Sequence, residues 1–185
     1  MQITTERLLI RPFKQEDFPF VHAYVSDEET MHYLPEDTFT EDDTKKFIEK
    51  HSCDNPEAFP VVLLKTNEVI GHISFEKYFG KHTYEIGWIF NKMFHDNGYA
   101  TEAARAMIAY AFETLNLHRV VATCQPENIA SYRVMEKIGM RREGFYKQCI
   151  PYKDTWWDEY SYAILQYEYM QNKKDNKCSC RGNLN

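Results

Sequence analysis

The sequence predicts one α/β (α+β) domain, in which a mostly antiparallel sheet contains a single strand–helix–strand–helix–strand crossover near its centre. Short segments that alternate apolar and polar side chains recur along the chain and predict strands. Longer segments with helical spacing interrupt them at three places. The chain has 185 residues, 43% of them hydrophobic and 15% aromatic, which is enough for one good core.

The first third of the chain predicts one strand followed by a helical insertion. Residues 6–13 (ERLLIRPF) alternate and predict the strand. Residues 14–34 have helical spacing that is broken at Asp27, which favours one or two short helices. Residues 38–52 predict a further helix, with Thr40 as its N-cap and acidic residues in its first turn.

The rest of the chain predicts strands with two helices among them. The strands are residues 58–65, 68–78, 82–90, 118–125, 141–150 and 155–169, with a tight turn at Thr66–Asn67 between the first two. The helices are residues 99–115, which bury one face, and residues 128–139, which end at Gly139 in a C-cap position. We expect the domain to occupy residues 1–170 and the polar residues 171–185 to form a disordered tail.

Charge and composition exclude several classes of partner. The formal net charge of −6 argues against a nucleic-acid-binding surface, which needs clustered Lys and Arg. Residues 1–60 carry −8 and residues 61–185 carry +2, so the first third could attract a cationic partner or simply be a well-solvated acidic surface. No apolar run approaches the roughly 20 residues that span a bilayer, and we expect no membrane partner.

The cysteines and histidines show no pattern of disulfides or metal ligands. The five cysteines are odd in number and scattered, which is typical of free thiols in a reducing cytoplasm. The N-terminal residues carry charges where a signal peptide has its apolar stretch. The histidines lack metal-ligand spacing, so we expect a cytoplasmic protein without a metal site.

A short loop, residues 95–101 (HDNGYAT), lies directly before the central helix. A helix N-terminus presents unpaired N–H groups and the positive end of the helix dipole. Gly98 permits close approach, so the loop suits a phosphate or pyrophosphate, although such loops also occur for structural reasons alone. It is neither a Walker loop nor a dinucleotide fingerprint, because the required Lys and the spaced glycines are missing.

Two motifs resemble the GNAT superfamily of acyl-CoA-dependent N-acetyltransferases. They are GYATEA at 98–103 and PENIASYRVMEKIGM at 126–140, and the resemblance extends over about residues 3–165. The segments TTERLLIRPFKQEDF and MHYLP are similar to the RimJ/RimL-type branch, which acetylates ribosomal-protein N-termini. The resemblance implies a central mixed, mostly antiparallel sheet with splayed middle strands, helices on both faces, and acetyl-CoA as co-substrate.

The resemblance also implies which residues bind the coenzyme. In the family, the loop before the central helix binds the CoA pyrophosphate through backbone amides, and the pantetheine arm lies between the splayed strands. The cofactor-binding positions that follow are Trp88, Ile89, Phe90, His95, Asp96, Asn97, Gly98, Tyr99, Ala100, Thr101 and Asn128. His95 and Asp96 depart from the family pattern, which favours Gln or Arg and then Gly. We expect these two departures to weaken cofactor binding without abolishing it, and His95 could help when protonated.

The chemistry requires a neutral amine, whereas lysine-type amines have pKa values around 10.4 and chain N-termini around 7.7 to 8. Glu85 is the candidate base, because apolar neighbours would raise the pKa of its carboxyl. Alternatively, Glu85 is a surface glutamate or a member of a structural ion pair. In that case water alone would deprotonate the amine. A backbone N–H near Trp88 or Ile89 could stabilise the oxyanion. The resemblance implies that Ser131 occupies the family's hydroxyl position nearest the CoA thiol, and Tyr132 is the other hydroxyl in reach of it. Ser131 could also be a helix-surface serine with no role.

The sequence therefore predicts transfer of an acetyl group from acetyl-CoA to a primary amine by direct attack in a ternary complex. The resemblance to the RimJ/RimL-type branch favours a peptide or protein N-terminal amine. A small-molecule amine, such as a polyamine or an antibiotic, remains an alternative acceptor. A non-catalytic acyl-CoA-binding module is an alternative of another class, and the sequence indicates no oligomeric state.

Overall fold

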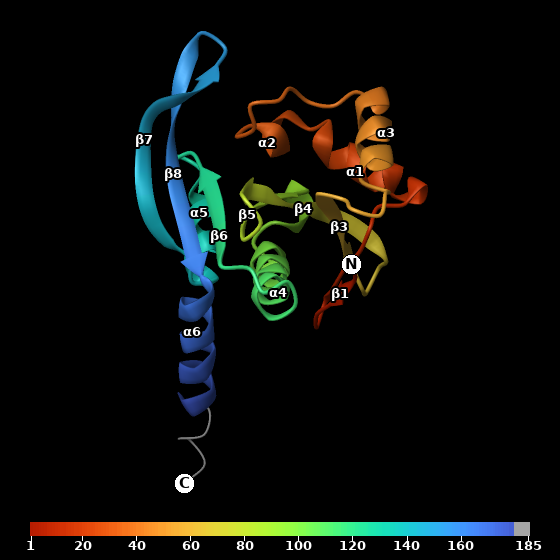
Figure 1. Ribbon diagram of the computed structural model, residues 1–185. Coiled ribbons are helices and arrows are strands. Elements are labelled where there is room, and N and C mark those ends of the chain that lie inside the picture. The colour runs from red at the N-terminus through yellow and green to blue at the C-terminus, as the bar shows by residue number, and fades with distance from the viewer. Residues whose placement is uncertain (180–185) are drawn as a thin grey trace.

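Eight strands form one sheet in the order β1-β2-β3-β4-β5-β6-β8-β7 (Figure 1). The computed structural model describes residues 1–179. The strands are β1 (Ile3–Thr4), β2 (Leu8–Ile10), β3 (Ala58–Leu63), β4 (Glu68–Phe79), β5 (Thr83–Phe90), β6 (Arg119–Cys124), β7 (Arg141–Tyr152) and β8 (Thr155–Leu165). Within the described residues, β5 and β6 are the one parallel pair, and every other neighbouring pair is antiparallel.

Helices lie on both faces of this sheet, as the family resemblance implies. They are η1 (Gln15–Asp17), α1 (Phe18–Val25), α2 (Glu28–Met31), α3 (Glu41–Lys50), η2 (Lys92–Phe94), α4 (Tyr99–Glu113), α5 (Ile129–Lys137) and α6 (Gln166–Ser179). The group α1–α3 lies on one side of strands β3–β5 and α4 on the other (Figure 1). Each side has its own core: Met107 and Phe112 of α4 belong to the larger one, and Val21 and Ile48 to the smaller one.

The expected boundaries of the helical insertion are confirmed by their caps. Asp27 ends the first helical segment and caps α2, because its side chain accepts a hydrogen bond from the Thr30 N–H. Thr40 caps α3 in a capping box with Asp43. Asn67, at the turn between β3 and β4, has a φ of 61°, which suits asparagine.

The structure differs from the sequence prediction at both ends of the chain. β1 is too short to give a periodic signal and was not predicted. Residues 166–169 were predicted to continue the last strand and residues 171–179 to be disordered, yet α6 covers both. Contacts with the domain stabilise this polar helix: Glu168 binds Arg141, and Lys173 binds Glu113 of α4. The remaining tail, residues 180–185, lies outside the described residues.

The cysteines of the described part agree with the expected thiols. Cys53, Cys124 and Cys149 are free. The side chains of Cys178 and Cys180 lie outside the described part of the chain. Within that part, no helix combines the length and the apolar character needed to cross a membrane.

A buried polar pair, Tyr24 and His72, joins α1 to β4. The Tyr24 hydroxyl oxygen lies 2.8 Å from His72 Nδ1, and both side chains are buried. Burial, with a smaller contribution from the charge of His51, lowers the pKa of His72 to about 3. The folded protein therefore holds this imidazole neutral.

This pair predicts a specific loss of stability in mild acid. Below the unfolded-state pKa of about 6.5, the unfolded chain protonates His72 and the folded chain does not, so the free energy of unfolding falls. At pH 5 the loss amounts to about 2 kcal/mol relative to neutral pH. Urea unfolding at pH 7 and pH 5 measures it, and His72→Gln should reduce this pH dependence by about that amount. An equal pH dependence in the two proteins would contradict the prediction.

Candidate active site

The parallel strands β5 and β6 separate part-way along their length. They pair from Thr83–Arg119 to Glu85–Val121 and no further, although β5 continues to Phe90 and β6 to Cys124. Beyond Glu85, β5 remains paired with β4, and β6 remains paired with β8. The expected splay is therefore present, and the facing backbone edges are open to an extended ligand arm.

Trp88, Ile89 and Phe90 lie on the β5 edge of this gap. Their backbones pair with Ile73, His72 and Gly71 of β4, so the opposite edge faces the gap. Trp88 packs against the larger core and Ile89 against the smaller one, while Phe90 is buried. The side chains fix the strand. The backbone groups on the edge away from β4 face the gap, and of these the Phe90 carbonyl accepts a hydrogen bond from His95.

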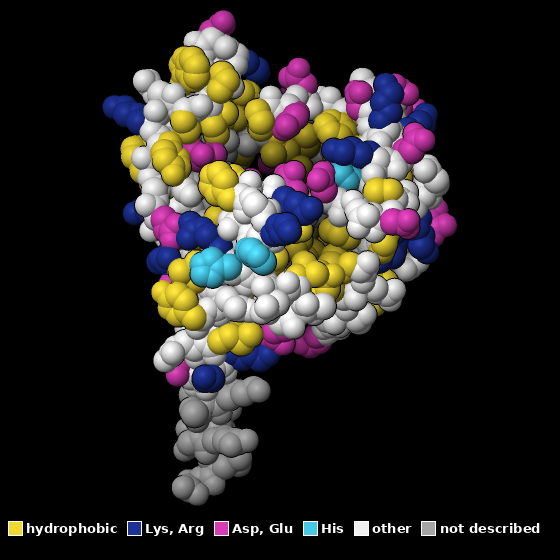
Figure 2. Space-filling view, viewed as in Figure 1, with side chains coloured by type: hydrophobic (Ala, Val, Ile, Leu, Met, Phe, Trp, Pro, Cys, Tyr) yellow, Lys and Arg dark blue, Asp and Glu magenta, His cyan; other side chains and the backbone are white. Residues whose placement is uncertain are grey.

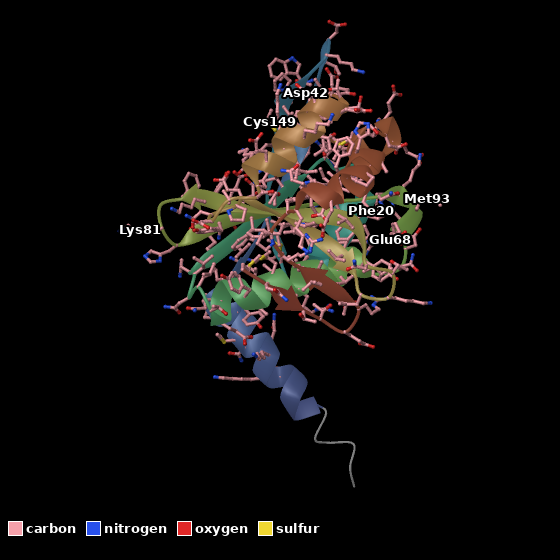
Figure 3. All side chains as sticks on the ribbon, turned by 90° about the vertical axis from the view of Figure 1, so that its right-hand side faces the viewer. Phe20, Asp42, Glu68, Lys81, Met93 and Cys149 are labelled. Carbon is pink, nitrogen blue, oxygen red and sulfur yellow. The ribbon has the colours of Figure 1, made fainter. Side chains whose placement is uncertain are left out.

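The loop before α4 has the geometry of an anion site. Two residues in the left-handed region, Asp96 (φ 59°) and Gly98 (φ 75°), turn the chain into the helix. The N–H of Glu102 bonds to the Gly98 carbonyl, so the N–H groups of residues 99–101 precede the first helical hydrogen bond. The loop residues therefore fit a pyrophosphate held by backbone amides. Figure 3 shows Met93 of η2, at this end of β5, and Lys81 at its other end.

Side chains of the loop residues stabilise its backbone conformation. His95 Nε2 lies 2.9 Å from the Phe90 carbonyl oxygen, to which it donates, so His95 supports the backbone. The Asn97 side-chain N–H₂ donates to the His95 carbonyl at 2.8 Å. The guanidinium carbon of Arg7 lies over the Tyr99 ring, 4.6 Å from the ring centroid.

Arg7 is a supporting residue that sequence reasoning missed. Its Nη1 donates to the Asn97 carbonyl at 3.0 Å, and its Nε donates to Glu102 Oε2 at 2.6 Å. Glu102 also accepts hydrogen bonds from the Arg7 backbone and the Thr5 hydroxyl. Arg7 precedes the loop by about 90 positions in an ordinary alternating strand, so its spacing gave no signal.

Asp96 places an exposed carboxylate on this loop. Substitution of Asp96 by Asn removes the negative charge, and Asn tolerates a positive φ as well as Asp does. We therefore expect Asp96→Asn to tighten acetyl-CoA binding by about two- to fivefold, which corresponds to 0.3–1 kcal/mol for one exposed charge at a helix N-terminus. Calorimetric titration with acetyl-CoA at low salt measures it, and the gain should shrink in high salt. An unchanged affinity would contradict this role for Asp96.

Glu85 lies where the splay begins. Its carboxylate Oε1 accepts a hydrogen bond from Thr123 Oγ1 of β6 at 3.2 Å. Burial raises the pKa of the Glu85 carboxyl, and the charges of Glu76 and Glu159 add to this rise. The hydrogen bond from Thr123 opposes it. Burial also raises the pKa of Glu159 on β8. Sequence reasoning missed Thr123 and Glu159, because neither lies in a motif.

The residues at the start of α5 are held by local hydrogen bonds. Asn128 is the N-cap: its Oδ1 accepts from the Ser131 N–H at 3.1 Å. Burial raises the pKa of the Cys124 thiol to about 11, and the neighbouring Ser131 side chain opposes this rise. Tyr132 is half-buried and packs edge-on against Tyr160, at 6.1 Å between ring centroids.

A hollow opens above the sheet between the β7–β8 hairpin and the α1–α3 side of the molecule (Figure 2). Figure 2 shows acidic side chains near its floor and apolar side chains along its wall. On the α5 side of the sheet lies a second concavity of about 500 Å³, lined by Tyr132, Arg133, Arg142 and Tyr160 among others. Within the described residues, no group of His, Cys, Asp and Glu side chains could hold a metal ion.

A family model for an acetyltransferase (GNAT) domain matches residues 7–141 of this chain, most of its length. The chain belongs to the GNAT acetyltransferase family. The uncharacterized N-acetyltransferase YnaD of Bacillus subtilis (strain 168) is 59% identical to this GNAT protein over 169 residues, or 91% of this chain and 99% of YnaD. The crystal structure of a GNAT-family acetyltransferase from Bacillus anthracis has a TM-score of 0.87 and 57% identity, covering 90% of this chain and 99% of that one.

A more distant structure, spermidine N-acetyltransferase from Vibrio cholerae in complex with CoA and spermine, shares the fold. Its TM-score is 0.78 at 24% identity, covering 90% of this chain and 99% of that one. The GNAT protein described here is thus an acetyl-CoA-dependent N-acetyltransferase, with acetyl-CoA as co-substrate and an amine as acceptor.

Proposed function

We propose that this acetyltransferase acts on a primary amine of a small polycation, such as a di- or polyamine, with Glu85 as the base. In the proposed site, loop 95–101, the free edge of β5 at Trp88, Ile89 and Phe90, and Asn128 hold acetyl-CoA. Acetyl-CoA supplies the electrophilic acetyl thioester. The acceptor then approaches over Glu76, Glu85 and Glu159.

The observation that carries this proposal is a row of three glutamates without a cation. Glu76 and Glu85 are directly opposite each other on β4 and β5, and Glu159 is close enough for its charge to raise the pKa of Glu85. None of the three forms a salt bridge within the described residues. Like charges directly opposite each other destabilise a sheet, so an acceptor with several positive charges would offset a real cost.

The same geometry favours Glu85 as the base. An ammonium group must lose a proton before it can attack, and a carboxylate whose pKa is raised towards neutral pH is a better acceptor for it. The Ser131 N–H donates to Asn128 Oδ1 at the start of α5, and no hydrogen bond engages the Tyr132 hydroxyl within the described residues. We therefore assign proton donation to the departing thiolate to Tyr132, and support of the α5 N-terminus to Ser131.

A peptide or protein N-terminal amine is the second candidate acceptor. The RimJ/RimL-type segments TTERLLIRPFKQEDF and MHYLP favour it. The fold is compatible with either class, since a spermidine N-acetyltransferase shares it. We also keep a cytoplasmic location as part of the proposal, supported by the free thiols of the described part.

An acceptor series separates the candidates. We expect kcat/KM for spermidine to exceed that for an alkyl monoamine of similar length by about tenfold or more, because each well-placed charge contributes on the order of 1 kcal/mol. Glu76→Gln should reduce this preference by raising KM for spermidine alone. Peptides with free N-termini that react faster than any polyamine would overturn the proposal in favour of the second candidate.

A further inference from the structure

Thr123 lies between two glutamates on the face of the sheet that carries Glu85. Its Oγ1 donates to Glu85 Oε1 at 3.2 Å, and Glu159 of β8 is its neighbour on the other side, close enough for Thr123 to oppose the rise in the pKa of Glu159. The sheet register explains this arrangement. Thr123 pairs with Ser161 on β8, and Glu159 is two residues before Ser161, which makes it the diagonal neighbour of Thr123 on the same face.

A single hydroxyl cannot donate to two carboxylates at the same time. Threonine has one O–H donor and two acceptor lone pairs. When Thr123 donates to Glu85, its oxygen can only accept from Glu159, and when it donates to Glu159 it can only accept from Glu85. The position of the Thr123 proton is thereby linked to which of the two carboxyls is protonated.

We propose that Thr123 is a positioning residue that joins Glu85 and Glu159 into a relay, through which the proton taken from the amine passes to Glu159. The inference rests on the proposed role of Glu85 as the base. In the first step the ammonium N–H bond breaks and the proton binds Glu85. In the second, Glu85 gives that proton to Thr123 Oγ1 while the Thr123 hydroxyl gives its own proton to Glu159.

The relay restores the base without changing the total number of protons held by the protein. Glu85 is again ionised, Thr123 is again a neutral hydroxyl, and Glu159 holds the extra proton until it passes to water. Glu159 is partly exposed and lies on the β8 side of the splay, so release to solvent does not require the acceptor to leave. Removal of the proton from Glu85 before the next acceptor arrives is the advantage of the second carboxyl.

Other titratable and charged groups face this pair from the neighbouring strands. The groups whose charges interact with this pair are Glu76 and Tyr78 on β4, Cys124 on β6 and Cys149 on β7. Glu76 raises the pKa of Glu85 by its charge, as Glu159 does. Substitution of Thr123 leaves all these charges in place, so it tests the hydroxyl alone.

The test uses Thr123→Val, which keeps the shape and loses the hydroxyl, and Thr123→Ser, which keeps the hydroxyl. We expect T123V to lower kcat by about tenfold, as for one lost hydrogen bond to a charged group, and to move the low-pH limb of the kcat/KM profile to higher pH. T123S should restore both. Glu159→Gln should also lower kcat, yet move the limb to lower pH, because a like charge is removed beside Glu85.

Carbon-13 NMR titration of the glutamate carboxyls, on protein without acceptor, gives a readout that does not depend on turnover. In T123V the titrations of Glu85 and Glu159 should both move to higher pH. A merely structural threonine would change stability or KM and leave these titrations in place, and that result overturns the relay. If Glu85→Gln has a low kcat while T123V behaves like wild type, Glu85 remains the proposed base and the relay through Thr123 is contradicted. If Glu85→Gln is as active as wild type, the proposed base fails and the relay with it.

Discussion

Glu85→Gln should lower kcat by about 10²- to 10⁴-fold at neutral pH, the usual contribution of a positioned general base. Gln has nearly the same shape and can still accept a hydrogen bond from Thr123, so the loss reports the proton acceptor rather than packing. The KM for acetyl-CoA should change little, because the loop that binds the pyrophosphate is left intact. Steady-state kinetics from pH 6 to pH 10 measure both parameters.

The loss in Glu85→Gln should diminish at high pH, where a growing fraction of the amine is already neutral. Glu68→Gln is a matched control: it makes the same change on β4 of the same sheet, at the opposite end of that strand from Glu76. It should behave like wild type. A Glu85→Gln enzyme within threefold of wild type at every pH would show that water or another group deprotonates the amine.

Gly98→Glu should raise the KM for acetyl-CoA by about two- to fivefold through charge repulsion and should also lower the stability of the fold. Gly98 has a φ of 75°, and a side chain in the left-handed region costs about 1–2 kcal/mol. A carboxylate at the N-terminus of α4 adds about 0.3–1 kcal/mol of repulsion towards an anion. Space is not the obstacle, because the nearest atom to an added Cβ, Arg7 Nη2, would be 3.7 Å away.

Gly80→Glu provides the matched control for this substitution. Gly80 has a φ of 60° at the turn between β4 and β5, and nothing lies within 4 Å of an added Cβ there. It therefore carries a similar backbone strain and the same new charge at a place outside the proposed site. Both variants should lose stability, and Gly98→Glu alone should lose affinity for acetyl-CoA in calorimetric titration. Equal affinities of the two variants for acetyl-CoA would show that the coenzyme does not bind at loop 95–101.

Sequence could predict those parts of the site that are built from residues adjacent in the chain. Gly98 needs a positive φ and directly precedes a helix, so the loop was recognisable from a few adjacent residues. The cap Thr40 and the helix break at Asp27 were visible for the same reason, whereas the N-cap role of Asn128 was not predicted. The splay between β5 and β6 followed from the family resemblance, since both strands are ordinary in composition.

The residues that sequence could not predict are brought to the site by strand pairing. Glu159 and Thr123 share a face only because β8 inserts between β6 and β7 with Thr123 opposite Ser161. Arg7 reaches the loop because β2 lies close to α4, where it meets Glu102. The C-terminal helix was missed because its polar residues show no apolar face. Its contacts are ion pairs with Glu113 and Arg141 and the packing of Tyr169 against Phe112, all made with residues distant in the sequence.

Amide hydrogen exchange with and without CoA is the measurement that tests the proposed site most directly, because it locates the coenzyme without requiring the acceptor. We predict protection on two segments: residues 98–102 at the start of α4, and residues 87–90 along the free edge of β5. Residues in the β7–β8 hairpin should not change. Protection confined to the concavity lined by Arg133 and Arg142, with none at the loop, would contradict the assignment of the coenzyme to the splay.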